Sequence, residues 1–173
     1  MRSNGTPVFL CIRSWLHKHF PGLKAGGTLY IPHEDVYTDP VRLMRFIDEQ
    51  ELTYIKMTPS LFHMMADSKG HTFDALRLVV LGGEPIVSED VETFMKQHPC
   101  VAVMNHYGPT ETTIGTVSKL MTLHELDALK ERSIIGKPIA HTRALVCNRE
   151  QRLVPYVHRV SSTFQVMVFQ KVI

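Results

Sequence analysis

The chain has 173 residues, of which 44% are hydrophobic and 21% are charged, and this composition is typical of a globular domain rather than of a disordered or fibrous chain. Its 19 basic and 17 acidic residues leave a net charge of +2, which is too balanced for the dense basic face of a dedicated nucleic-acid-binding module. Because no apolar run approaches the roughly 18 residues of a membrane span and residues 1–7 are polar, we expect a cytoplasmic protein without a membrane segment.

The predicted secondary structure alternates between strands and helices from residue 26 onward. Residues 26–32 (GGTLYIP) are typical of a short buried strand bounded by glycines and a proline. A helix is expected next, because Thr38 or Asp39 can cap it, Pro40 suits its first turn and apolar residues follow at helical spacing. Residues 52–57 (LTYIKM) then predict a second strand.

The alternation continues through the centre of the chain. Thr58 and Pro59 repeat the cap-and-proline start of a helix, and residues 76–81 (LRLVVL) are typical of a parallel strand buried on both faces. Ser88 is expected to cap a further helix, and residues 100–105 (CVAVMN) predict another strand. This order predicts an α/β fold with a doubly wound, mostly parallel sheet, flanking helices, and ligands at the carboxyl ends of the strands.

Two loops at such strand ends carry most of the chemically active side chains. Residues 81–85 (LGGEP) contain paired glycines, which let a ligand approach the backbone closely. Residues 105–113 (NHYGPTETT) place an amide, an imidazole, a phenol, hydroxyls and a carboxylate within nine residues. Either loop by itself is compatible with an ordinary tight turn. Their occurrence one strand–helix–strand unit apart favours a binding site.

The second loop resembles a known motif. NHYGPTE is similar to the Asn-x-Tyr-Gly-Pro-Thr-Glu motif of adenylate-forming enzymes, specifically of the amino-acid adenylation domains of non-ribosomal peptide synthetases. LVVLGGE upstream and residues 134–146 (IIGKPIAHTRALV) downstream match the same family in order and approximate spacing. The resemblance covers about residues 22–155 and implies part of the large N-terminal domain of such an enzyme. It also implies that ATP and an amino acid form an aminoacyl adenylate, which passes to the phosphopantetheine thiol of a peptidyl carrier domain.

The resemblance implies nucleotide-binding roles for both loops. Tyr107 resembles the ring that packs on adenine, Gly108 leaves room beside it for a flat base, and Asn105 belongs to the same nucleotide-binding group. Thr110 resembles the hydroxyl donor to the α-phosphate, and Glu111 resembles the carboxylate that holds Mg²⁺, a hard cation that prefers oxygen ligands. These last two are the implied catalytic residues. The residues that resemble the wall on the other side of the nucleotide are Gly82, Gly83 and Glu84.

A pocket for the amino-acid side chain is implied in the same way. By alignment on the motifs, its positions are Lys56, Val80, Gly82, His106, Ile114 and Gly115. Lys56 stands at the end of an apolar strand, where an ammonium is costly to bury without an anion, and His106 lies at a second strand end facing the same crevice. Two potential cations call for an anionic substrate, and the pattern resembles aspartate-activating domains; asparagine activators are similar but generally lack the histidine. From the residues alone, Lys56 could instead extend to solvent and His106 could be structural.

The chain departs from the family near both ends. It has no Ser/Thr/Gly-rich phosphate loop, no ribose-binding Asp motif and no C-terminal domain with a catalytic Lys, and residues 1–33 offer no acid to hold the substrate amine. We therefore expect a divergent segment over residues 1–21, a partial AMP-binding adenylation domain over residues 22–155 and a divergent tail over residues 156–173. Such a gene fragment should be inactive alone. The alternatives are a non-catalytic remnant or scaffold without a ligand, and a generic α/β nucleotide-binding protein.

Overall fold

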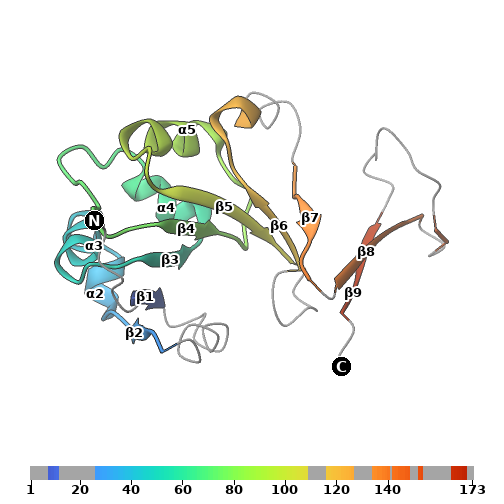
Figure 1. Cartoon of the computed structure of the whole chain (residues 1–173), viewed down its shortest axis with the longest axis horizontal. Coiled ribbons are helices and arrows are strands. Elements are labelled where there is room, and N and C mark those ends of the chain that lie inside the picture. Colours follow the sequence, from blue (N-terminus) through green and yellow to red (C-terminus); the bar gives the residue numbers. More distant parts are fainter. Residues whose placement is uncertain are drawn as a thin grey trace.

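A mixed sheet forms the centre of the molecule in a computed structural model that describes residues 8–11, 26–108, 116–126, 134–140, 142–148, 152–153 and 165–170. The described residues form a seven-stranded sheet in the order β2-β1-β3-β4-β5-β6-β7 (Figure 1). Neighbouring strands are parallel from β2 to β5, whereas β6 and β7 continue the sheet in antiparallel pairing. Two further strands, β8 and β9, form a separate antiparallel pair.

The elements follow one another as strand and helix through the centre of the chain. The strands are β1 (Val8–Cys11), β2 (Thr28–Tyr30), β3 (Tyr54–Met57), β4 (Leu78–Leu81), β5 (Ala102–Tyr107), β6 (Val117–Leu120), β7 (Lys137–Pro138), β8 (Thr142–Cys147) and β9 (Gln165–Gln170). The labelled helices are α2 (Glu34–Tyr37), α3 (Pro40–Glu49), α4 (Pro59–Met65) and α5 (Ser88–Gln97). The predicted mostly parallel α/β sheet with flanking helices is therefore confirmed. Within the described part of the chain, no helix has the length and apolar character that crossing a membrane requires.

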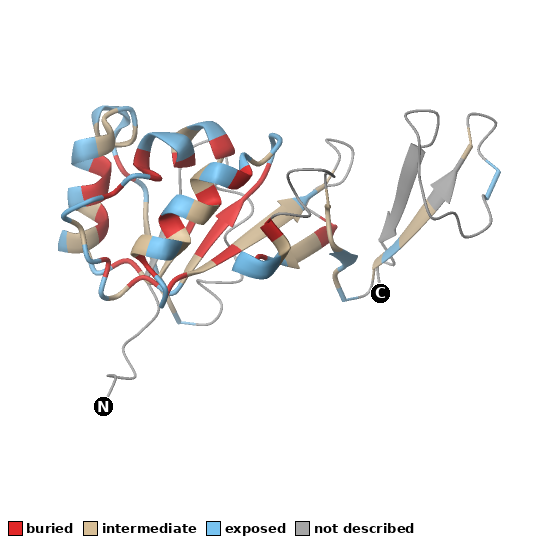
Figure 2. Cartoon of the chain, turned by 90° about the horizontal axis from the view of Figure 1, so that it is seen from above, coloured by how far each residue is buried: buried red, intermediate tan, exposed pale blue. Residues whose placement is uncertain are grey.

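One face of the sheet packs against α3, α4 and α5, and Figure 2 shows the buried residues gathered where these helices meet the strands. The strand residues in this core are Ile55, Met57, Val79, Leu81 and Val103. The helix residues that meet them include Leu43, Ile47, Phe62, Met65, Val91 and Phe94. Right-handed connections between parallel strands place successive helices on the same face when the strands advance in one direction, as β3, β4 and β5 do. Alternate residues of the same strands therefore point to the opposite face.

Two helices begin where the sequence predicts. The carboxylate of Asp39 accepts hydrogen bonds from the backbone N–H groups of Val41 and Arg42, at 2.9 Å and 3.2 Å, and caps α3. The hydroxyl of Thr58 accepts from the N–H of Leu61 at 3.3 Å and caps α4. A proline follows each cap in the first helical turn, where its missing N–H costs no hydrogen bond.

The predicted cap at Ser88 is wrong. Helix α5 begins at Ser88 itself, and Val87, whose side chain cannot accept a hydrogen bond, occupies the position before it. The Ser88 hydroxyl instead donates to the Glu89 carboxylate at 3.1 Å. Glu89 and Asp90 place negative charge in the first turn, where it interacts favourably with the helix dipole. Because Ser88 stands one position too late to cap α5, the acidic residues of the first turn stabilise the start of the helix instead.

The strand predicted over residues 100–105 extends further than the sequence indicates. Strand β5 continues through His106 and Tyr107, because β6 pairs with it in antiparallel register, with His106 opposite Ser118 and Tyr107 opposite Val117. The motif expected as a loop from Asn105 onward therefore starts within a strand. As a result, its first three side chains alternate between the two faces of the sheet.

A buried histidine follows the end of α5. His98 is 6% exposed and lies between the rings of Phe73 and Phe94, at centroid distances of 4.9 Å and 4.7 Å. The hydroxyl of Ser68 lies 2.6 Å from its Nε2 atom, which can accept a hydrogen bond when the ring is neutral. Burial lowers the pKa of His98 below its ordinary value, and a backbone hydrogen bond with Thr72 only partly opposes this shift.

We expect the free energy of unfolding to decrease as the pH falls below 6.5, the ordinary pKa of a histidine. In that range the unfolded chain binds a proton at His98 more readily than the folded chain does, so acidification favours unfolding. Denaturant titrations between about pH 7.5 and pH 5.5 should show a shallower pH dependence for His98→Phe than for the unchanged chain. Equal pH dependence in His98→Phe and the unchanged chain would contradict the assignment.

Candidate functional site

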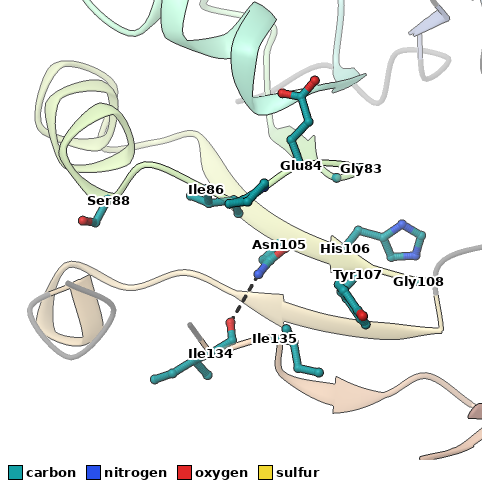
Figure 3. Close-up of a pocket in the computed structure, with 12 residues that line it drawn as sticks. Gly83, Glu84, Ile86, Ser88, Asn105, His106, Tyr107, Gly108, Ile134 and Ile135 are labelled. Atoms are coloured by element: carbon teal, nitrogen blue, oxygen red, sulfur yellow. Dashed lines mark hydrogen bonds between the residues drawn. The ribbon is translucent and has the colours of Figure 1, made fainter. Parts of the chain in front are cut away.

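A cavity of about 280 Å³ lies at the carboxyl ends of β4 and β5 (Figure 3). Both predicted loops contribute to its wall, together with the segment that leads into α5 and residues 134–135. The residues predicted for nucleotide binding that line it are Gly82, Gly83, Glu84, Asn105, Tyr107 and Gly108. The fold thus brings these two separate stretches of sequence to one place, as expected for the strand ends of a parallel sheet.

An aromatic ring and two isoleucines give the cavity an apolar side. Tyr107, at the end of β5, is 41% exposed, and Ile134 and Ile135 lie across from it (Figure 3). The side-chain amide of Asn105 donates a hydrogen bond to the Ile134 carbonyl at 3.2 Å, which holds this segment beside β5. Asn105 therefore has a contact within the protein in addition to its predicted nucleotide role.

The contribution of Ile134 and Ile135 to the cavity was not predicted. One signal for it is Gly136, which follows the two isoleucines and has a φ of +109°. A Cβ atom at this position would lie 2.2 Å from the backbone oxygen of Ser118 in β6. The glycine lets the segment approach the sheet closely enough to place the isoleucines at the cavity.

The carboxylate of Glu84 is directed towards α4, away from Tyr107 (Figure 3). The hydroxyl of Ser60 and its backbone N–H both donate to this carboxylate. These two hydrogen bonds lower the pKa of Glu84 below its ordinary value, and the bond from the Ser60 hydroxyl has the larger effect. Glu84 is consequently ionised at neutral pH. It is part of the cavity wall because the loop after β4, on which it lies, lines the cavity.

Three of the residues predicted for the amino-acid pocket, Lys56, Val80 and His106, lie together on neighbouring strands, and His106 and Gly82 also line the cavity. His106 stands between Asn105 and Tyr107 in β5, so its side chain points away from theirs (Figure 3). Lys56 of β3 pairs in register with Val80 of β4, and both side chains are buried. The fold therefore brings Lys56, Val80 and His106 to one surface, across three neighbouring strands.

Lys56 and His106 contact each other directly. Lys56 is only 4% exposed, and its Nζ atom lies 3.1 Å from Nδ1 of His106. An ammonium group can donate hydrogen bonds but cannot accept them, so a charged Lys56 requires Nδ1 to be an acceptor. His106 is then neutral and carries its proton on Nε2. In this arrangement the two side chains carry one positive charge, not the two that their residue types allow, and Lys56 does not extend to solvent.

Gly82 makes room for this arrangement. A Cβ atom at Gly82 would lie 2.4 Å from the backbone oxygen of His106, a distance too short for any other residue without movement of the backbone. The glycine follows β4, which lies between the strands that carry Lys56 and His106. Gly82 therefore contributes to both predicted sites. It is part of the wall of the nucleotide cavity, and it lets the end of β4 approach the His106 backbone of β5 closely.

Four predicted site residues lie outside the described residues: Thr110, Glu111, Ile114 and Gly115. The predicted contacts with the α-phosphate and with Mg²⁺ therefore have no geometry in this structure. Among the residues that are described, no group of three or more His, Cys, Asp or Glu side chains is arranged to hold a metal ion.

Comparison with known proteins identifies relatives of the chain. The model of the AMP-binding enzyme family matches residues 6–160. Bacitracin synthase 3 of Bacillus licheniformis and surfactin synthase subunit 2 of Bacillus subtilis are each 46% identical to it over 140 residues, which is 79% of this chain. The match covers 2% of the first protein and 4% of the second, so the chain spans a small part of these relatives.

Solved structures share the fold. An NRPS protein containing adenylation and PCP domains, solved with a vinylsulfonamide inhibitor, superposes with a TM-score of 0.72 at 25% identity, over 89% of this chain and 27% of that one. An amide bond synthetase from Marinactinospora thermotolerans has the same fold, with a TM-score of 0.70 at 22% identity, over 90% of this chain and 31% of that one. The chain therefore belongs to the AMP-binding enzyme family.

Proposed function

We propose that the chain provides the nucleotide wall and the side-chain pocket of an adenylation domain that activates aspartate. In this reaction aspartate and ATP give aspartyl adenylate and pyrophosphate, and the aspartyl group then passes to the phosphopantetheine thiol of a peptidyl carrier domain. The observation that carries the proposal is the buried contact of 3.1 Å between Lys56 and His106, on the face of β5 opposite Tyr107.

The hydrogen-bonding character of this pair favours a carboxylate over an amide. The Lys56 ammonium has only donors, and a neutral His106 that accepts at Nδ1 has a donor at Nε2. An aspartate side chain offers acceptors to both groups and balances the single positive charge. A charge-assisted hydrogen bond of this kind contributes about 1.5–3 kcal/mol. Asparagine would place its NH₂ donors against donors and carries no negative charge to offer the ammonium.

The cavity at the carboxyl ends of β4 and β5 suits a flat aromatic base. Its volume of about 280 Å³ is close to the lower end of small-molecule pockets, about 300–1,000 Å³. The Tyr107 ring and the isoleucines offer apolar surface on one side, and Gly82 and Gly83 allow close approach on the other. We place the adenine of ATP there, with Thr110 and Glu111 as the proposed partners of the α-phosphate and Mg²⁺. A bound Mg²⁺ would neutralise phosphate charge.

The chain by itself is proposed to bind a nucleotide without turning it over. Its 173 residues include no Ser/Thr/Gly-rich phosphate loop and no ribose-binding Asp motif, and each lost contact to the transition state lowers the rate. The boundaries of the adenylation segment at residues 22 and 155 are part of this proposal. Binding, rather than turnover, is therefore the appropriate test for the isolated chain.

The chain is expected to bind AMP, and Tyr107→Ala should weaken this binding by at least about fivefold, because stacking of a base on an aromatic ring contributes about 1–3 kcal/mol. Isothermal titration calorimetry measures the affinities. Tyr107→Phe keeps the ring and is the matched control, with an expected affinity close to that of the unchanged chain. No AMP binding by the unchanged chain would favour a scaffold or remnant without a ligand. If Tyr107→Ala bound AMP as tightly as the unchanged chain, the Tyr107 ring would not be part of the nucleotide site.

A further inference from the structure

The first turn of α4 needs a hydrogen-bond acceptor from another part of the chain. Thr58 serves two of its N–H groups, since its hydroxyl accepts from Leu61 at 3.3 Å and its carbonyl accepts from Phe62 at 3.0 Å. Pro59 has no N–H group to satisfy. The remaining donor of this turn is the backbone N–H of Ser60, which the cap residue does not reach.

Glu84 supplies that acceptor from the loop after β4. Its Oε2 atom lies 2.9 Å from the Ser60 nitrogen and also accepts from the Ser60 hydroxyl. The carboxylate is ionised at neutral pH and stands at the positive end of the helix, where negative charge is favoured. Its orientation towards α4 leaves Tyr107 on the other side of the loop (Figure 3).

The same loop is attached to the β3–α4 connection at a second point. The backbone N–H of Gly82 donates to the carbonyl of Met57, the last residue of β3, at 3.3 Å. Gly83, with a φ of +90°, lies between this bond and the one made by Glu84. The glycine wall of the cavity is thus held at both ends by residues 57–60, which follow directly after Lys56.

We propose that Glu84 is a positioning residue: by binding Ser60 it fixes the Gly82–Gly83 wall of the cavity, and its carboxylate makes no contact with the ligand. The ligand in this inference is the adenosine nucleotide of the proposed function, on which the inference rests. Among the described residues that line the cavity, Ser60 is absent. Any effect of the Ser60 hydroxyl on ligand affinity must therefore pass through Glu84.

The test measures the affinity of the 173-residue chain for AMP and for adenosine in Ser60→Ala, Glu84→Ala and the double variant. Each single variant should weaken binding by at least about threefold, and the double variant should be no weaker than Glu84→Ala, because coupled residues have non-additive effects. AMP and adenosine should lose affinity by the same factor, since the altered wall faces the base. Glu84→Gln keeps an acceptor oxygen and should recover part of the loss. Glu34→Ala, which removes an exposed carboxylate from α2, is the matched control.

Two results would overturn the inference. Additive losses would mean that Glu84 acts on the ligand independently of Ser60, and a loss in Glu84→Ala with unchanged binding in Ser60→Ala would mean that the Ser60 hydroxyl does not hold the carboxylate. If the unchanged chain binds neither AMP nor adenosine, the proposed function fails, and amide hydrogen exchange then decides the inference independently. The Gly82 amide should exchange at least about threefold faster in Ser60→Ala and Glu84→Ala than in Glu34→Ala. An unchanged exchange rate would show that Glu84 does not hold the wall.

Discussion

Lys56→Met should lower aspartate activation by at least about tenfold in a chain that still folds. The substitution removes the ammonium of the Lys56–His106 contact, so a bound aspartate carboxylate would lose its charge-assisted hydrogen bond to Lys56, at a cost of more than about 1.4 kcal/mol. Methionine has a similar length and fills much of the same buried space without the charge. Aspartate-dependent ATP–pyrophosphate exchange measures activation after residues 26–155 are grafted into a complete adenylation domain, and denaturant titration of the chain measures stability.

His106→Glu provides the reciprocal test in the same graft. The new carboxylate would lie close enough to Lys56 to balance its charge, would repel aspartate and could accept a hydrogen bond from an amide, so the preference should shift towards asparagine. Unchanged aspartate use in Lys56→Met, or activation of a hydrophobic amino acid by the unchanged graft, would contradict the proposed pocket. The assignment of the cavity to the nucleotide would be unaffected by that result.

Gly82→Ala is expected to disturb both the fold and the site. Its Cβ atom would lie 2.4 Å from the backbone oxygen of His106, and backbone cannot move aside as easily as the end of a side chain. Overpacking of this kind costs about 1–3 kcal/mol, which denaturant titration would detect. Because relief of the clash moves β4 and β5 apart at their carboxyl ends, AMP affinity should decrease together with stability.

Gly70→Ala separates this steric effect from the ordinary backbone cost of replacing a glycine. Gly70 has a φ of +92°, and no atom lies within 4 Å of an added Cβ. Its substitution should cost about 1–2 kcal/mol through backbone strain alone. AMP affinity should stay unchanged, because Gly70 is not among the described residues that line the cavity. If Gly82→Ala also retained full AMP affinity, the close approach of β4 and β5 would not be needed for the cavity.

The sequence predicted those parts of the fold that depend on neighbouring residues. The starts of α3 and α4 followed from a capping side chain and a proline at adjacent positions, Asp39 with Pro40 and Thr58 with Pro59. The start of α5 was placed wrongly because Ser88 has the chemistry of a cap but already adopts helical geometry. In that case the acidic first turn stabilises the helix end, and local sequence cannot distinguish the two solutions.

Features that depend on pairing between strands far apart in the chain could not be predicted from the sequence. Strand β1 lies between β2 and β3, an order that neither composition nor periodicity indicates. The extension of β5 depends on its pairing with β6, and the position of Ile134 depends on a hydrogen bond from Asn105. For the candidate site, the motifs indicated which residues gather at the strand ends. They could not indicate the number of charges, since that depends on the 3.1 Å distance between Lys56 and His106.

Because side chains alternate along β5, this one strand contributes residues to the sites of both proposed ligands. The Tyr107 side chain faces the cavity for the base, whereas the neighbouring His106 contacts Lys56 on the other face and also borders the cavity at the end of the strand. The two proposed ligands would therefore lie close together at the carboxyl end of β5, where His106 borders both. Substrate choice can consequently diverge through residues of one face while the nucleotide surface on the other face is retained, which would let related domains acquire new amino acids without rebuilding their use of ATP.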